Sequence, residues 1–86
     1  KAMIIYEALY NDCIFESAFQ TISLHLSKEG AEEAIETHKK NKLQYLRETL
    51  AESFKKDGYS EKEIEKELEE YMDMRAWTVS ETEVLP

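Results

Sequence analysis

The chain has 86 residues and a net charge of −8, with 42% hydrophobic residues, 35% charged residues and one cysteine. This composition is typical of a small globular domain and argues against a disordered, disulfide-stapled or membrane-spanning chain, because no apolar run reaches the roughly 20 residues that cross a bilayer. We therefore expect one soluble, cytoplasmic domain over residues 1–86. The negative charge disfavours binding to nucleic acid.

The N-terminal third of the chain predicts a β-hairpin. Residues 3–10 are nearly all apolar, with many β-branched and aromatic side chains, which is typical of a strand. Asn11 and Asp12 form a turn pair, and residues 13–26 alternate as a second strand. Fourteen residues is long for a strand, so we expect a bulge near residues 17–20. One apolar face of this strand is expected to meet the helices, and its members are Ile14, Ala18, Ile22, Leu24 and Leu26.

A long helix is predicted over residues 28–57. Ser27 is the expected N-cap, because its hydroxyl can accept a hydrogen bond from an amide of the first turn. Gly58 is expected to follow the helix with a positive φ. The phase of the apolar stripe drifts near Asn41, which leaves two shorter helices as the alternative. No glycine or proline lies there, so we favour one helix.

A second helix is predicted over residues 61–75. The run Ser60-Glu61-Lys62-Glu63 has the S-x-x-E pattern of a capping box, which marks the start of a helix. Residues 61–73 hold seven acids and two bases, for a net charge of −5. Residues 39–56 of the first helix hold six bases and two acids, for +4. We therefore expect the two helices to pack as an antiparallel hairpin with opposite charges side by side.

The last predicted element is a third strand over residues 77–85, where apolar and polar residues alternate. The order ββααβ then predicts an α+β fold, a three-stranded antiparallel sheet with the two-helix hairpin packed on one face. The other face would lack cover and expose apolar side chains, so we expect a homodimer, formed through the sheet faces or through the overhanging helices. The residues expected there, besides one side of the third strand, are Cys13, Phe15, Phe19 and either Tyr6 or Ile5.

No motif in the chain predicts catalysis, a metal site or a cofactor. His25, His38 and Cys13 are the only soft metal ligands, and their positions follow no ligand spacing, so we expect structural roles for all three. The paired carboxylates fall on helix faces exposed to water, where general acid–base chemistry is disfavoured. The hypothesis is therefore a protein that is not an enzyme.

The second helix carries an acidic face as the candidate partner-binding site, formed by Glu61, Glu65, Glu69, Glu70 and Asp73. Together with Glu81 and Glu83, this face is a candidate mimic of phosphate charge that blocks the nucleic-acid groove of a basic host protein. The alternative is a solubilising face, since Lys62 and Lys66 interrupt the acids. DNA binding through the basic residues 39–56 is a further alternative.

Residues 22–35, ISLHLSKEGAEEAI, resemble the S-x-E-x-A-x-x-A-I strand-to-helix junction of small uncharacterised proteins from bacteriophages and prophages. The strand over residues 77–85 is similar to theirs as well. The resemblance covers about a third of the chain and includes no catalytic motif. It implies a phage origin, a location in the host cytoplasm, and an accessory role through protein–protein contacts. An anti-defence inhibitor is the alternative that the acidic face suggests.

Overall fold

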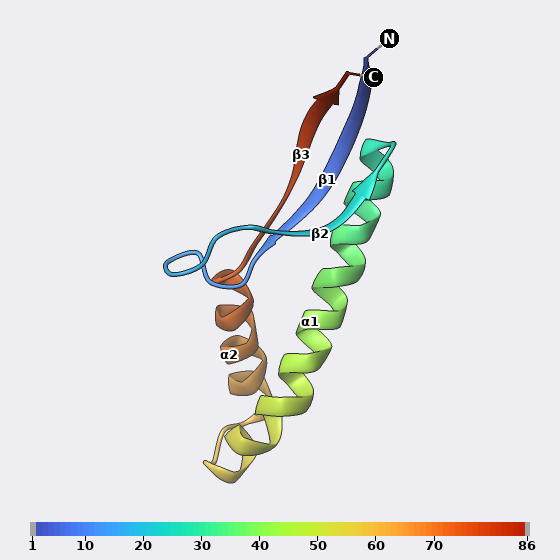
Figure 1. The fold of residues 1–86 in the computed structure, drawn as a ribbon. Helices are drawn as coiled ribbons and strands as arrows, with labels where there is room; N and C mark the ends of the chain where they lie inside the picture. Colours follow the sequence, from blue (N-terminus) through green and yellow to red (C-terminus); the bar gives the residue numbers. More distant parts are fainter. Residues whose placement is uncertain (1, 86) are drawn as a thin grey trace.

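The computed structural model describes residues 2–85, and Lys1 and Pro86 lie outside the described part. Figure 1 shows the elements in chain order: β1 (Met3–Asn11), β2 (Gln20–His25), α1 (Lys28–Lys56), α2 (Glu61–Asp73) and β3 (Ala76–Val84). The strands form one antiparallel sheet in the order β2-β1-β3. The predicted α+β class and the ββααβ order are confirmed. Within residues 2–85, no helix combines the length and apolarity needed to cross a bilayer.

The helix ends follow the local signals of the sequence. The Ser27 hydroxyl accepts a hydrogen bond from the Gly30 amide at 3.1 Å, and α1 then runs unbroken to Lys56. Gly58 follows with a φ of +90°, a conformation that glycine adopts without a steric penalty. Ser60 begins α2 with both bonds of a capping box, to and from Glu63. The single long helix and both N-caps are therefore confirmed.

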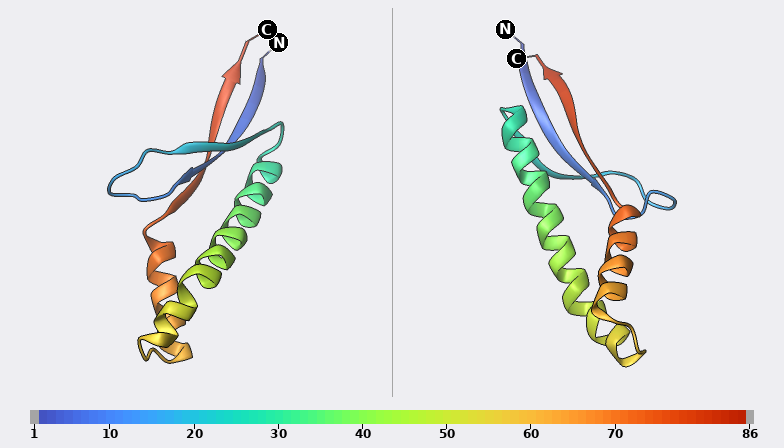
Figure 2. Two further views of the ribbon diagram at one scale, coloured as in Figure 1. Left: turned by 60° about the horizontal axis from the view of Figure 1, so that its bottom comes forward. Right: turned by 180° about the vertical axis from the view of Figure 1, so that it is seen from behind.

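The first half of α1 lies across one face of the sheet (Figure 2). Ala8 in β1 and Ala31 in α1 are fully buried, and Ile35 packs beside them. Small side chains on both elements let the helix backbone approach the sheet closely. We call this group and the partly buried residues around it the sheet cluster; the surrounding residues are Tyr6, Ile22, Ala34, Trp77 and Val79.

The second half of α1 and α2 form a helical arm that extends beyond the sheet (Figure 1). Leu46 from α1 packs against Ile64 and Leu68 from α2, and these three buried side chains are the centre of the arm cluster. Of the two helices, α1 is the one that covers the sheet, whereas α2 packs mainly on α1. The hairpin thus has only one of its helices on the sheet, in contrast to the predicted hairpin with both helices on it.

The second strand is shorter than predicted. The structure places β2 at Gln20–His25, and the residues from Asp12 to Phe19 form a loop. The Ile14 amide of this loop donates to the Met74 carbonyl at the end of α2, at 2.9 Å, so its backbone bonds to the arm and not to β1. The predicted bulge exists but lies at Ile22, because Ala8 pairs with Ser23 while Leu9 pairs with Thr21.

The predicted inner face of this strand is wrong except at Ile22, which packs in the sheet cluster. The extra residue at the bulge reverses the alternation of the side chains that follow it. Leu24 is therefore 64% exposed, and Leu26, beyond the strand, is 74% exposed. The other two predicted members, Ile14 and Ala18, are exposed residues of the loop.

Leu68 is the only large side chain below 2% exposure among the described residues, so its truncation tests the arm cluster. We expect Leu68→Ala to lower the free energy of unfolding by about 2–5 kcal/mol, because it removes buried methyl groups and leaves a cavity. Urea denaturation followed by circular dichroism measures this loss. The matched substitution Leu26→Ala, at a 74% exposed position beyond the end of β2, should cost less than about 0.5 kcal/mol. Equal losses in the two variants would contradict the assignment.

Candidate functional site

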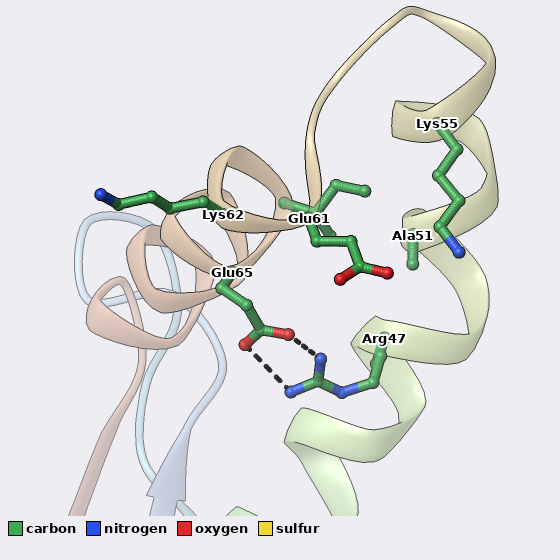
Figure 3. A pocket seen from close by; sticks show the side chains of 7 residues that line it. Arg47, Ala51, Lys55, Glu61, Lys62 and Glu65 are labelled. Atoms are coloured by element: carbon green, nitrogen blue, oxygen red, sulfur yellow. Dashed lines mark hydrogen bonds and ion pairs between the residues drawn. The ribbon is translucent and has the colours of Figure 1, made fainter.

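The predicted acidic face is divided between two sides of α2. Glu61 and Glu65 line a groove of about 420 Å³ between the helices, opposite Arg47 and Lys55 of α1 (Figure 3). The Arg47 guanidinium donates two hydrogen bonds to the Glu65 carboxylate, one of them at 3.2 Å. These bonds lower the pKa of Glu65 and raise that of Arg47. The expected pairing of the basic and acidic helices is therefore present at this position.

The remaining three acids of the predicted site, Glu69, Glu70 and Asp73, are exposed on α2. Within residues 2–85 they form no ion pair. Glu81 and Glu83 lie toward the far end of β3, at the opposite end of the molecule from the arm (Figure 1). The acids of α2 and β3 therefore do not form one continuous face.

Three of the basic residues of α1 are engaged within the chain. Lys39 lies 3.7 Å from Glu36 and above the Trp77 ring, and Lys42 lies 3.8 Å from a carboxylate oxygen of Asp12. Arg47 is held by Glu65, as described above. The basic half of α1 is thus partly neutralised, which disfavours the DNA-binding alternative.

The three potential metal ligands named from the sequence lie apart. The Trp77 indole N–H donates to Nδ1 of His38 at 3.0 Å, whereas Nε2 of His25 lies 2.6 Å from the Ser23 hydroxyl. Cys13 belongs to the loop before β2. Over the described part of the chain, no group of three His, Cys, Asp or Glu residues could hold a metal ion. Each histidine thus has a hydrogen-bond partner of its own.

The densest set of polar contacts lies where the arm meets the sheet, and we call it the junction. The Tyr10 hydroxyl, at the end of β1, donates to the Asp12 carboxylate. Arg75, between α2 and β3, donates its Nε–H toward the Tyr10 oxygen at 3.1 Å and Asp12 Oδ1 at 3.2 Å. His38 completes the junction, with its ring centroid 4.5 Å from that of Tyr10. These contacts join β1, α1 and the segment between α2 and β3.

Burial and the hydrogen bonds of the junction fix its protonation states. Burial, together with the bond to Asp12, raises the pKa of Tyr10 to about 12. The Tyr10 bond and the nearby Arg75 and Lys42 charges lower the pKa of Asp12. Burial, helped by Lys42, lowers the pKa of His38. At pH 7 the junction therefore holds a neutral tyrosine, an ionised aspartate and a neutral histidine, an arrangement that positions the arm on the sheet.

The junction could not be predicted from the sequence. Asp12 has the local pattern of a turn residue, and its contact with Arg75 joins residues 63 positions apart. No local spacing reports such a contact, because only the pairing of β1 with β3 brings the two residues together. The one sign of this contact in the sequence is Arg75, a charged residue at the end of the apolar stripe of α2.

The uncovered face of the sheet is the second surface that stands out. Ala8 and Val79 point toward α1, so their neighbours along the strands point to the opposite face. Ile5 is on this open face as expected, whereas Tyr6 packs in the sheet cluster. The loop residues Cys13, Phe15 and Phe19 lie outside the strands of the sheet. We define the open face by the residues Met3, Ile5, Glu7, Leu9, Thr21, Leu24, Thr78, Ser80, Thr82 and Val84.

Comparison with known proteins gave no significant match among protein-family models, curated proteins or solved structures. The resemblance of residues 22–35 to small phage proteins therefore stays a prediction.

Replacing Asp12 tests the junction. We expect Asp12→Asn to lower the free energy of unfolding at pH 7 by up to about 1 kcal/mol, since it removes an ion pair whose carboxylate is 54% exposed to water. The pKa of Asp12 is lower in the folded protein than in the unfolded chain. Its contribution is therefore complete above about pH 4 and is lost as the pH falls further.

Urea denaturation at neutral and acidic pH measures this difference. The difference in the free energy of unfolding between the wild type and Asp12→Asn should become smaller in acid. Glu70→Gln, at an exposed acid of α2, should have nearly the free energy of unfolding of the wild type at either pH. A difference that stays constant down to the lowest pH would contradict the role given to the Asp12 charge.

The hydrogen bond from Trp77 requires a neutral His38, because Nδ1 must accept. Since the pKa of His38 is lower in the folded protein, the unfolded chain takes up the proton first, and stability should fall as the pH drops below about 6.5. We expect His38→Gln to lose less stability over this range, as measured by urea denaturation with Trp77 fluorescence. His25→Gln should retain the wild-type pH dependence. The same dependence in all three proteins would refute the assignment.

Proposed function

We propose that this protein acts by protein–protein contact and not by catalysis, and that the helical arm meets the partner. The observation that carries the proposal is the projection of the arm beyond the sheet. Its second helix packs mainly on α1 and leaves one whole side to the solvent. A helical hairpin that covers little of its own fold supports a role in contacting another molecule.

The outer side of α2 has the composition of a contact surface for a basic protein. Glu69, Glu70 and Asp73 are exposed there, and Tyr71 and Met74 add exposed apolar area. Exposed apolar side chains together with an excess of acids favour a partner that offers a basic rim around an apolar patch. The proposed partner is therefore a protein with a positively charged surface.

The geometry supports this general contact role better than mimicry of nucleic acid. Glu61 and Glu65 face the groove between the helices, and Lys66 lies among the outer acids. Glu81 and Glu83 are at the other end of the molecule (Figure 1). Mimicry of a phosphate backbone needs a continuous row of acids, so it remains the alternative. An accessory role in a phage remains a proposal from the sequence resemblance.

Charge reversal on the arm tests the proposal. We expect the triple variant Glu69→Lys, Glu70→Lys and Asp73→Lys to bind the partner at least about tenfold more weakly, because three favourable charge contacts become repulsive. The partner is captured from bacterial lysate at low salt, and its affinity is then measured after purification. If duplex DNA competes with this protein for the partner in that assay, the result would favour the alternative in which the arm mimics nucleic acid.

The control is a second triple variant, Glu32→Lys, Glu33→Lys and Glu36→Lys, which makes the same change in net charge on the exposed side of α1. It should bind like the wild type, with circular dichroism confirming that both variants are folded. Equal weakening in the two variants would show a response to total charge and would overturn the assignment to the arm. Retention of no protein by the wild type would count against a contact role.

A further inference from the structure

The open face of the sheet is apolar at its edges and nearly uncharged. Met3 is 54% exposed, Val84 opposite it is 45% exposed, and Leu24 is 64% exposed. The one charged residue among its strand positions is Glu7, which accepts a hydrogen bond from the Thr21 hydroxyl. The other charged residues of the part of the chain that the structure describes lie outside these positions. Depletion of charge is the compositional feature that separates interface cores from ordinary surface.

The chain also exposes more surface than its mass requires. Its accessible area is 6390 Å² for 10.1 kDa, whereas a folded monomer of this mass exposes about 5,300 Å². The excess of about 1,100 Å² is larger than the roughly 800 Å² that each partner buries in an interface of standard size. The exposed apolar side chains of the open face, Met3, Leu24 and Val84, contribute to this uncovered surface.

The elongated shape of the molecule also shows that much of its surface is left uncovered. The radius of gyration is 16.6 Å and the molecule measures 60 × 24 × 15 Å, whereas a compact domain of this length has a radius near 12 Å. At the end of the sheet that is remote from the arm, β1 and β3 extend beyond the start of α1 as a two-stranded ribbon (Figures 1 and 2). Ile4 points to the α1 side of this ribbon and is nevertheless exposed. A two-stranded ribbon is marginally stable unless something packs on it.

We propose that the open face is covered by the open face of a second copy, which gives a homodimer with the two helical arms on its outer sides. The same surface on both copies makes a twofold, isologous interface. Two chains that each carry a net charge of −8 repel one another, and a face with a single, hydrogen-bonded charge is where they can approach closely. This inference concerns a surface separate from the arm and does not depend on the role proposed for the arm.

Leu24→Glu tests the interface, because it places a charge at the most exposed apolar position of the face. We expect the wild type to have the mass of two chains in light scattering from low to high micromolar concentration. The variant should dimerise more than about a hundredfold more weakly, since an unpaired carboxylate would be buried between the copies. Val84→Glu, on β3, serves as the second variant and should have the same effect.

Phe15→Glu is the control, because Phe15 is 78% exposed in the loop before β2 and lies outside the strands that form the open face. It should remain dimeric, and circular dichroism should show all variants folded. A monomeric wild type over the whole concentration range would overturn the inference. So would a dimer that survives both Leu24→Glu and Val84→Glu, or one that is equally weakened by Phe15→Glu. The mass is measured on the purified protein without any partner from lysate. The result therefore does not depend on whether the arm binds a partner.

Discussion

The carboxylate of Asp12 joins the two halves of this molecule. It accepts a hydrogen bond from Tyr10 at the end of β1, lies within 3.2 Å of the Arg75 Nε atom, and faces Lys42 of α1. The sheet cluster lies on one side of this junction and the arm cluster on the other. Each cluster contains three buried residues, so the direction of the arm depends on the junction and on the continuity of α1.

This division explains why so much of the surface remains uncovered. A chain of 86 residues buries a modest fraction of its area in any case, and here that area is shared between two small clusters. The side chains that make up the arm cluster are not available to cover the second face of the sheet. The uncovered apolar face and the projecting charged arm are the two surfaces on which the proposed contacts rest.

Several features could be predicted because their causes lie within a few residues of one another. The Ser27 cap, the Ser60–Glu63 capping box and the positive φ of Gly58 each depend on neighbours no more than four positions away. The same is true of the apolar stripes of the helices and of the apolar and alternating runs of the strands, which together give the element order ββααβ and hence the fold class. The packing of the basic helix beside the acidic one could also be predicted, although the Arg47–Glu65 pair itself could not.

The sequence by itself therefore determined the order and type of the elements, where each helix starts, and that one face of the sheet is left bare. Only the tertiary structure decided that β2 begins at Gln20, that Leu24 points outward after the bulge, and that Asp12 meets Arg75. It also divided the acids of α2 between the groove and the solvent. The physical reason is distance along the chain: caps and helical periodicity are local interactions, whereas strand register and the side of a helix that is covered depend on residues far away.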